Sequence, residues 1–484
     1  MADPILGGLA DDTLTGTEAA ELFAGDGEAL TVGQQGGDDS ILALGGDDTV
    51  HGDAPLMTQA QGGDDTIGGG DGADRLHGDG ASLIPHFVSS PTPPPQVADG
   101  SDLVEGGGGG DTIWGDAVSG PPRATFGTDT LRGGDGDDLV FGDFQSGWGG
   151  PFPVAGDLIE GGAGQDTLYG DSDTSFFSRS TAGDTIFGGE GDDVITGDAR
   201  THTALEPGGP GWGIAAELND SGGPDELHGG AGNDLIIGDF ARDFASIDGD
   251  DTITGDGGDD TLYGDGIDQQ YPRLGNDSIE GGAGRDLIQG DTTFLEFSAQ
   301  ISPSFDFGGR DHLSGGEGDD TILGDATGLR PDPLGRPEEL RVLGGADTLE
   351  GGRGNDELTG GPGADRFDFR EGDGQDVVTD FTPGEDVLRF PGVDPAGIGV
   401  APAAAGGLLV SYGGSGDTVS LPGVAALGPA DIATTPPPPA QAVDWNALAA
   451  EVLANFAATG RWFASPAPGT EPPPGPVDWD ALAA

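Results

Sequence analysis

A nine-residue phrase recurs along most of this chain and is the unit from which the chain must fold. It reads G-G-x-G-x-D-x-U-x, where U is a large apolar residue, as in "GGAGQDTLY" from Gly161. A unit this short cannot bury an apolar face alone, so stacked copies are expected to build a shared core. Complete G-G-x-G-x-D turns lie at 69–74, 106–111, 133–138, 161–166, 188–193, 229–234, 281–286, 315–320, 351–356 and 360–365. Degenerate copies keep the final aspartate at Asp12, Asp39, Asp48, Asp65, Asp102, Asp129, Asp251, Asp260, Asp277 and Asp347.

The residue types in one unit indicate a tight turn followed by a short strand. Glycine accepts positive φ, which lets a turn aim its carbonyl oxygens at one point. Side chains alternate along a strand, so we expect Asp166 and Leu168 to face inward and Thr167 and Tyr169 to face outward. Carboxylate and carbonyl oxygens suit Ca²⁺, whereas Mg²⁺ demands stricter octahedral geometry. The absence of soft or imidazole ligands at the key positions argues against zinc and copper.

The charge of the chain requires a counterion if the chain is to fold. Its 484 residues include 98 Gly and 36 Pro, and 87 acidic residues face 17 basic ones, for a net charge of −70. Such a polyanion stays disordered unless cations neutralise it. A disordered Gly-Asp linker is disfavoured, because it would not keep an apolar residue two places after each aspartate. Nucleic acid is an improbable partner because its phosphates would be repelled.

Three further classes of feature are missing from the sequence. The chain has no Cys, so neither disulfides nor thiolate metal sites are expected. No apolar run approaches the roughly 20 residues that span a bilayer. The first residues, "MADPILGGLADD", show no cleavable secretory signal.

The complete turns resemble the RTX, or haemolysin-type, calcium-binding nonapeptide repeats, over roughly residues 7–366. The resemblance implies an all-β parallel β-roll, a two-sheet right-handed β-solenoid, with many Ca²⁺ ions shared between turns of successive coils. It also implies that the final aspartates bind metal, with backbone carbonyls of the first and third turn positions. The candidate aspartates are Asp74, Asp102, Asp111, Asp129, Asp138, Asp166, Asp193, Asp234, Asp251, Asp260, Asp277, Asp286, Asp320, Asp347, Asp356 and Asp365. The candidate carbonyl donors are Gly106, Gly108, Gly133, Asp135, Gly161, Ala163, Gly188, Glu190, Gly229, Ala231, Gly281, Ala283, Gly315, Glu317, Gly351 and Arg353.

Variable insertions follow only every second turn, after a "GD" dipeptide. Two half-turns make one coil, so the insertions are expected to leave the roll along one long edge, with the complete turns and denser ion binding on the other. On the insertion edge aspartate replaces the second glycine, and it either adds a ligand or caps the loop. These residues are Asp116, Asp143, Asp171, Asp198, Asp239, Asp265, Asp291 and Asp325.

The outward residues before each turn differ between the two sheets. One face is largely apolar: His77, Trp114, Phe141, Tyr169, Thr196, Ile237, Tyr263, Gln289 and Leu323. The other is mostly polar: Glu105, Arg132, Glu160, Phe187, His228, Thr254, Glu280, Ser314 and Glu350. Either the insertions fold back over the apolar face, or that face serves assembly or binding. The insertions supply suitable aromatic residues: Phe87, Phe126, Phe144, Trp148, Phe152, Phe176, Phe177, Trp212, Phe294 and Phe297.

The chain is divided into a roll (1–366), a β capping region (367–433) and a tail (434–484). Residues 364–390 are expected to form antiparallel strands that cap the roll, and 406–424 a hairpin; this region resembles the cap of serralysin-type secreted proteins. In the tail, Pro-rich linkers flank 443–463, where apolar residues lie near helical spacing. The end "VDWDALAA" repeats "VDWNALAA". The tail is either a docking helix with a duplicated end or a type I secretion signal.

No catalytic constellation is found, because H-E-x-x-H is absent and no G-x-S-x-G elbow precedes a helix. We therefore expect a secreted, extracellular, non-enzymatic calcium-binding protein with a structural or adhesive role in a matrix, surface layer or filament. Expected partners are calcium ions, the type I secretion machinery and further copies of the chain. The alternatives are an extracellular enzyme or carbohydrate-binding protein with its site in the insertions, and a secretion passenger or calcium buffer.

Overall fold

The computed structural model describes most of the chain before residue 435. It describes residues 3–434 except 59, 85–99, 121–125, 148–151, 154, 176–177, 180–181, 203–219, 240–241, 245, 271–273, 293, 297–307, 326–327, 331–343 and 415. The expected tail helix over 443–463 therefore lies outside the described residues, as do Phe87, Trp148, Phe176, Phe177, Trp212 and Phe297.

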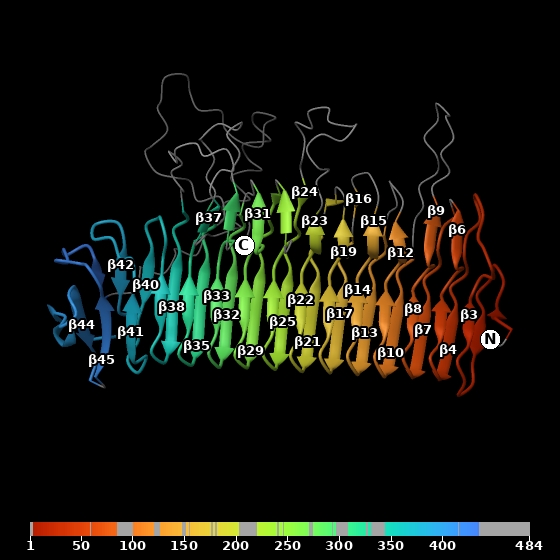
Figure 1. Cartoon of the computed structure of the whole chain (residues 1–484), viewed down its shortest axis with the longest axis horizontal. Helices are drawn as coiled ribbons and strands as arrows, with labels where there is room; N and C mark the ends of the chain where they lie inside the picture. Colours follow the sequence, from red (N-terminus) through yellow and green to blue (C-terminus); the bar gives the residue numbers. More distant parts are fainter. Residues whose placement is uncertain are drawn as a thin grey trace, which may run out of the picture. The chain divides into compact units, whose positions relative to one another are not determined.

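Two large sheets run through the described part of the chain, and successive coils lie side by side in sequence order (Figure 1). Each coil contributes one strand to each sheet, and most neighbouring strands pair in parallel. This confirms the all-β parallel β-roll. In order of pairing, the first sheet contains β1 (Ile5–Leu6), β3 (Leu22–Ala24), β5 (Thr49–His51), β8 (Arg75–His77), β11 (Thr112–Trp114), β14 (Leu139–Phe141), β18 (Thr167–Tyr169), β22 (Val194–Thr196), β26 (Leu235–Ile237), β30 (Thr261–Tyr263), β33 (Leu287–Gln289), β36 (Thr321–Leu323), β39 (Glu357–Thr359), β41 (Gln375–Val378), β45 (Asp417–Leu421), β44 (Leu408–Tyr412) and β43 (Gly399–Pro402). The second contains β2 (Thr13–Thr15), β4 (Ser40–Gly45), β7 (Thr66–Asp71), β10 (Leu103–Gly108), β13 (Thr130–Asp135), β17 (Leu158–Ala163), β21 (Thr185–Glu190), β25 (Glu226–Ala231), β29 (Thr252–Gly257), β32 (Ser278–Ala283), β35 (His312–Glu317), β38 (Thr348–Arg353), β40 (Arg366–Asp368), β42 (Val387–Arg389) and β46 (Ile432–Ala433).

The core is thin and consists of the apolar U residues of both sheets. In the coil of β17 and β18 these are Ile159 and Leu168, both fully buried, and the next coil contributes Ile186 and Ile195. Their register is maintained because Ile159 pairs with Ile186 and Leu168 with Ile195. A coil therefore buries one apolar residue from each strand, as the two-residue strand period requires.

The insertions build short strands of their own, which the sequence did not predict. Neighbouring insertions pair with one another in parallel, so they continue the stacking of the coils from which they leave (Figure 1). Their small sheets, in order of pairing, are β6 (Leu56–Thr58) and β9 (Ser82–Ile84); β12 (Ala117–Gly120), β15 (Phe144–Gly147), β19 (Ser172–Ser175) and β23 (Ala199–His202); β16 (Phe152–Pro153), β20 (Ser178–Arg179), β24 (Asp220–Ser221) and β28 (Ser246–Ile247); and β27 (Arg242–Phe244), β31 (Asp268–Gln270), β34 (Phe294–Glu296) and β37 (Gly328–Arg330).

The apolar outer face of the first sheet is buried along much of its length. Trp114, Phe141 and Tyr169 are at most 6% exposed, and their rings stack with centroids 6.0 and 5.2 Å apart. Val118 of the neighbouring insertion strand β12 packs against them. These three rings are therefore buried, and an insertion strand packs against their cluster, so this part of the face is not a bare assembly surface. That the insertions cover the rest of the face stays a prediction.

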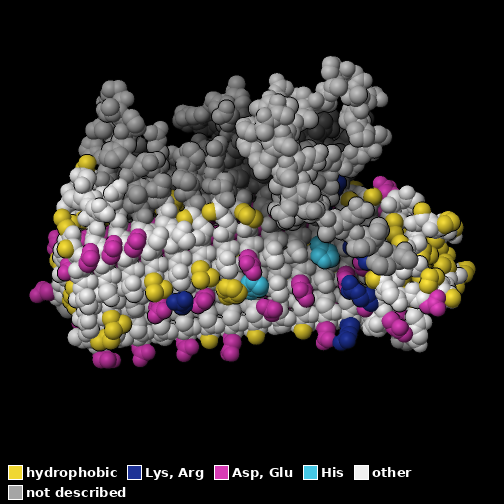
Figure 2. Space-filling model, turned by 180° about the vertical axis from the view of Figure 1, so that it is seen from behind, with side chains coloured by type: hydrophobic (Ala, Val, Ile, Leu, Met, Phe, Trp, Pro, Cys, Tyr) yellow, Lys and Arg dark blue, Asp and Glu magenta, His cyan; other side chains and the backbone are white. Residues whose placement is uncertain are grey.

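The outer face of the second sheet is polar, as expected. Arg132 forms ion pairs with Glu105 at 3.0 Å and Glu160 at 2.7 Å, and the ring of Phe187, 38% exposed, stacks on His228. Viewed from behind, Asp and Glu side chains recur along the molecule with few Lys or Arg among them (Figure 2).

We expect Phe141→Ala to lower the free energy of unfolding by about 3–5 kcal/mol, since it removes a fully enclosed ring. Phe187→Ala is the matched control and should cost much less, because its ring is partly exposed. Urea unfolding in saturating calcium measures both. Equal losses for the two variants would contradict the burial of the Phe141 face.

The C-terminal end of the roll differs from the prediction. Residues 364–390 were expected to pair antiparallel, but β40 pairs in parallel with β38 and β42, and β41 pairs in parallel with β39. The aspartate–strand pattern continues there through Asp365 and Asp376, which explains why the coils continue. Antiparallel pairing begins only with β43, β44 and β45, and the hairpin expected over 406–424 is confirmed as β44–β45. A 3₁₀ turn, Pro395–Gly397, precedes these strands.

Candidate metal centre

All complete turns except 360–365 connect strands of the second sheet to strands of the first. The turn 161–166 joins β17 to β18, and Gly162 and Gly164 have φ of 115° and 146°. These angles favour glycine, so the two glycines allow the turn to close tightly. We call this side of the roll the turn edge, and the opposite side, from which the insertions leave, the loop edge.

The final aspartates of the turns form a continuous file along the turn edge. Asp166 Oδ1 accepts the backbone N–H of Asp138 at 2.8 Å, and Asp193 Oδ1 accepts that of Asp166 at 2.8 Å. Each carboxylate thus binds the coil before it, and each side chain is almost fully buried. The turn file comprises Asp48, Asp74, Asp111, Asp138, Asp166, Asp193, Asp234, Asp260, Asp286, Asp320, Asp356 and Asp376.

The second oxygen of each turn-file carboxylate has no hydrogen-bond partner although it is buried. In the turn 161–166, Asp166 Oδ2 lies beside Gly161, where an added Cβ would fall 2.5 Å from this oxygen and 2.6 Å from the carbonyl oxygen of Gly188. The first glycine therefore leaves room for a cradle lined by one carboxylate oxygen and the first-position carbonyl of the next coil. Because buried polar atoms are nearly always satisfied, a file of such oxygens fits the ligands of a bound cation.

The donors around the cradle fit Ca²⁺. They are hard oxygen atoms, partly from the backbone, which Ca²⁺ accepts in flexible sets of six to eight. The carbonyls of the third turn position are placed differently from those of the first. Ala163 O, for example, accepts the N–H of Gly136 at 2.7 Å. The same bond along the stack is made by the carbonyls of Gly108, Asp135, Glu190, Ala231, Ala283, Glu317 and Arg353. A carbonyl oxygen has a second lone pair, so their role as ligands stays a prediction.

The loop edge carries two files of buried aspartates. The return file stands where the chain re-enters the roll, and it repeats the bond of the turn file: Asp157 Oδ1 accepts the N–H of Asp129 at 2.8 Å. Its members are Asp39, Asp65, Asp102, Asp129, Asp157, Asp184, Asp225, Asp251, Asp277, Asp311, Asp347 and Asp365, and the Oδ2 atoms of all of them are buried without a hydrogen-bond partner. The exit file stands where the chain leaves the roll, and comprises Asp26, Asp53, Asp79, Asp116, Asp143, Asp171, Asp198, Asp239, Asp265, Asp291 and Asp325.

Exit aspartates cap the insertions. Asp265 Oδ1 accepts the N–H of Gly275 at 2.8 Å, and Asp291 Oδ1 accepts that of Gly309 at 2.9 Å, so each closes the loop at the point where the insertion returns. Of the two roles that the sequence left open, the capping role is therefore observed. We expected denser ion binding at the turn edge. The buried carboxylates are more numerous at the loop edge, which holds two files of aspartates, whereas the turn edge holds one.

In all three files, burial raises the pKa of carboxyl groups above the ordinary value for aspartate, as at Asp166, Asp157 and Asp143. It raises the pKa of Asp166 to about 7, and the charges of Asp138 and Asp193 add to the effect although a backbone hydrogen bond opposes it. At the loop edge, burial together with the charges of Asp129 and Asp184 holds the pKa of Asp157 well above its ordinary value. Both edges therefore favour either protons or cations over bare carboxylates.

All of the metal-binding aspartates proposed from the sequence fall into these files. Asp74, Asp111, Asp138, Asp166, Asp193, Asp234, Asp260, Asp286, Asp320 and Asp356 lie in the turn file, whereas Asp102, Asp129, Asp251, Asp277 and Asp347 lie in the return file. Asp365 ends a complete turn but stands in the return file, because it lies between β39 and β40, at the loop edge. Its turn keeps all its glycines because this coil has no insertion.

Four return-file members were not recognised from the sequence as belonging to repeat copies: Asp157, Asp184, Asp225 and Asp311. The complete G-G-x-G stretch is missing before them, but each still has an apolar U residue two places later, and that signal would have identified them.

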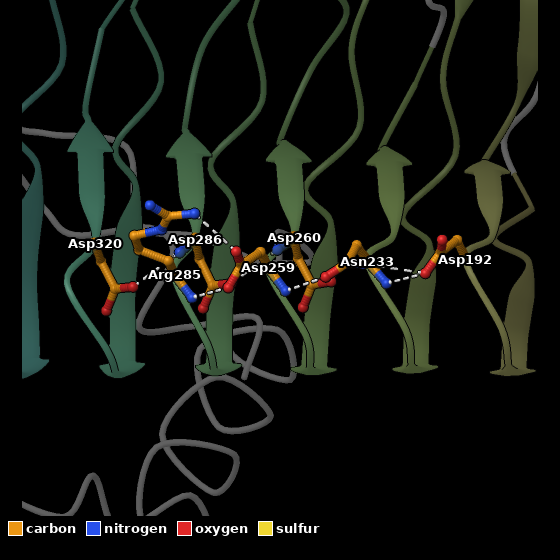
Figure 3. Close-up of polar contacts among 7 residues, drawn as sticks. All are labelled: Asp192, Asn233, Asp259, Asp260, Arg285, Asp286 and Asp320. Carbon is orange, nitrogen blue, oxygen red and sulfur yellow. Dashed lines mark hydrogen bonds and ion pairs between the residues drawn. The ribbon is translucent and has the colours of Figure 1, made fainter.

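A further row of polar contacts lies outside the turn edge, at the residue before each turn-file aspartate. Asp192 Oδ1 accepts the N–H of Asn233 at 2.8 Å, Asn233 Oδ1 accepts that of Asp259 at 2.7 Å, and the side chain of Arg285 reaches Asp259 at 2.8 Å (Figure 3). The turn-file bonds of Asp260, Asp286 and Asp320 run beside this row (Figure 3). The row is exposed, so it ties coils together without forming a buried site.

Stacked parallel coils with glycine cradles and files of buried carboxylates define a calcium-binding β-roll. A family model described as RTX calcium-binding nonapeptide repeat matches residues 35–54, 59–82, 98–117, 123–147, 156–176, 180–199, 217–245, 248–266, 273–292, 307–326 and 343–376. The chain belongs to this RTX family, and it binds Ca²⁺. Proteins with these repeats are generally secreted by type I systems and are typically non-catalytic. No curated protein matches the chain.

We expect Gly161→Ala to destabilise the calcium-loaded roll by about 1–3 kcal/mol, because the new Cβ would overpack the space between Asp166 Oδ2 and Gly188 O. Gln165→Ala, in the exposed part of the same turn, is the control and should change stability little. Urea unfolding at fixed free calcium measures the difference. A Gly161→Ala protein as stable as wild type would show that the cradle is not a tight space.

Proposed function

We propose that this protein is a secreted calcium-loaded β-roll with a structural or adhesive role outside the cell, as part of a matrix, surface layer or filament. The observation that carries the proposal is the extent of the roll, because nearly all described residues belong to its coils, its insertions or the strands that end it. Little of the described chain is left for a separate catalytic domain.

Calcium is proposed to control folding on export. The ligands would be the Oδ2 atoms of the turn and return files, with first-position carbonyls such as that of Gly188. At low cytosolic calcium these carboxylates repel one another, which keeps the chain unfolded for the secretion channel. At roughly millimolar calcium outside, ions bind only the folded coils and shift the equilibrium by mass action.

The positions of His51, His77 and His228 do not favour catalysis. His51 and His77 are buried in the ring stack of the first sheet with centroids 4.5 Å apart, and burial lowers the pKa of both. His228 contacts Glu226 at 3.4 Å on the outer face of the other sheet. No helix among the described residues is long and apolar enough to cross a bilayer.

The division into roll, cap and tail at 366 and 433 is part of the proposal, and so is the C-terminal export signal. Because Trp114, Phe141 and Tyr169 are buried, self-association would use the insertions rather than the apolar face.

Electron microscopy of the full chain, with calcium and after EGTA treatment, tests the proposed role. Ordered filaments or sheets that require calcium are expected. A calcium-loaded protein that stays monomeric and instead binds glycans on an array, or hydrolyses a substrate in an exoenzyme panel, would overturn the structural role in favour of a site in the insertions.

A further inference from the structure

Both ends of the roll leave strand edges open. Among the described strands, β1 pairs only with β3 and β2 only with β4 at the N-terminal end. At the opposite end of the stack, β43 pairs only with β44 and β46 only with β42. A strand at the edge of a sheet presents N–H and C=O groups that can pair with a strand of another chain. Each end therefore offers one such edge in each sheet.

The core is incompletely covered at the N-terminal end. Ile5 stands in register with Phe23 in the first sheet, and Leu14 stands in register with Ile41 in the second. Phe23 and Ile41 are buried, whereas Ile5 and Leu14 pack against the core but are only partly buried. Core residues inside the stack are covered by coils on both sides, but these two have a neighbouring coil on one side only. The first coil therefore leaves two core positions open to a further coil.

The strands that end the roll do not close its core either. Val400 of β43 lies opposite Val410 of β44, which is fully buried, yet Val400 is 47% exposed. In the second sheet Ile432 pairs with the fully buried Leu388 and is itself only partly buried. Viewed from behind, apolar side chains gather at this end of the molecule (Figure 2). Both ends of the core are thus available for contact.

Exposed apolar side chains are concentrated at these two ends. Among the described residues, Phe187 is the one large exposed apolar side chain between residues 57 and 399. The others lie in the first coils or in β43 and β44: Leu6, Leu9, Leu22, Val32, Leu42, Leu44, Leu56, Val400 and Leu409. Apolar surface that gathers in this way, rather than being scattered, is typical of an interaction site.

The direction of the terminal strands identifies what can cover them. β46 is parallel to β42, which is parallel to β40, so β46 runs in the direction of the second sheet of the roll. β45 is parallel to β41, and two successive antiparallel pairings, β45 with β44 and β44 with β43, restore that direction at β43. Both edges at the C-terminal end of the roll therefore have the strand direction that β1 and β2 have at the other end.

We propose that copies of this chain stack head to tail, with β1 and β2 of one copy following β43 and β46 of the next. The two sheets and the core then continue from one copy into another by the same parallel stacking that joins the coils within a copy. A contact between two different surfaces does not close on itself, so it produces an open filament. This inference rests on the proposed structural role and names its axial contact, whereas the insertions would join copies side by side.

Charge makes this contact dependent on screening. Asp11 and Glu18 are exposed near the N-terminal end, and Glu385 and Asp394 are exposed near the other. Like charges across a contact oppose association, and dissolved ions weaken that repulsion. Chains of the calcium-loaded protein should therefore lengthen as the ionic strength rises.

Sedimentation velocity and electron microscopy of the full chain at saturating calcium test the contact. Wild type should form linear chains that lengthen with protein concentration. Leu6→Asp at one end, or Val400→Asp at the other, should weaken association at least about tenfold, because each places a charge opposite an acidic, apolar end. Phe187→Asp is the matched control: Phe187 is similarly exposed but lies midway along the roll, so this variant should assemble as wild type does.

An equimolar mixture of the Leu6→Asp and Val400→Asp proteins tests the head-to-tail arrangement. Each variant keeps one intact end, so the mixture should form dimers of one copy of each and no longer chains. If Val400→Asp formed dimers alone, the contact would join two N-terminal ends, and the head-to-tail arrangement would be wrong. Circular dichroism in calcium checks that the variants fold, and Leu6→Ser with Val400→Ser replaces any that does not.

The outcomes separate this inference from the proposed function. Filaments of wild-type length in both end variants would overturn the end contact and leave the structural role to the insertions. A calcium-loaded wild type that stays monomeric at every ionic strength would overturn both, and residues 435–484 or another protein would then be the candidates to cover the ends.

Discussion

Removal of calcium at about pH 7.5 is expected to abolish the strand signal of the whole roll in far-ultraviolet circular dichroism. The turn and return files place consecutive buried carboxylates along both edges, each with one oxygen that no protein group satisfies. Without cations these groups repel one another and lose their hydration on folding, so the unfolded chain is favoured.

The expected effect is large because many sites act on one equilibrium. At free calcium a hundredfold above its dissociation constant, one site adds about 2.7 kcal/mol to the free energy of unfolding. Five such sites would add about 13 kcal/mol, which is comparable with the entire stability of a typical domain, about 5–15 kcal/mol. Coils contact only their neighbours in the stack, so refolding on calcium addition should spread from coil to coil.

Titration of the EGTA-treated protein with CaCl₂ checks this expectation, and MgCl₂ at the same concentrations is the control. Magnesium should restore little signal, because a site rich in backbone oxygens does not suit its strict octahedral geometry. A full strand signal in EGTA would show that the cradles are structurally complete without metal.

The local repeat determines the fold more completely than it determines the sites. The resemblance to RTX repeats predicted the parallel roll, and the alternation of Asp166 and Leu168 predicted which side chains face inward; every coil repeats this alternation, and stacking maintains the register. The same rule, applied after the last complete turn, would have predicted the parallel strands β40 and β41 from Asp365 and Asp376. The antiparallel expectation gave too much weight to the change in composition around Phe367 and Phe369.

The loop edge was harder to predict because its ligand candidates are separated by insertions of different lengths. Asp157 and Asp184 lack the preceding G-G-x-G, and only the stacked structure shows that they continue the file of Asp129. The strands of the insertions form for a related reason, since each pairs with the insertion of the next coil.

Acid should substitute for calcium in folding the roll. Burial raises the pKa of Asp111, Asp166, Asp260 and Asp320 to about 7, from an ordinary value of 3.8. A carboxyl group whose pKa is higher in the folded than in the unfolded chain stabilises the fold fully at a pH below about 4. That contribution is lost as the pH rises through about 7. Metal-free protein should therefore form strands near pH 4 and lose them between about pH 4 and 7.

The same groups predict how pH affects calcium binding. Ca²⁺ binds the ionised carboxylate, so binding must release protons wherever the metal-free fold holds them. The calcium concentration at half-folding should fall as the pH falls from about 7 to 5, because protonation stabilises the metal-free fold, and the protons that this fold holds should be released measurably on calcium binding in weakly buffered solution. The acid arm uses protein dialysed from EGTA into metal-free buffer, with circular dichroism and sedimentation followed together to separate folding from aggregation. A metal-free chain that stays unfolded near pH 4 would show that charge repulsion between the aspartate files is not what keeps the roll open.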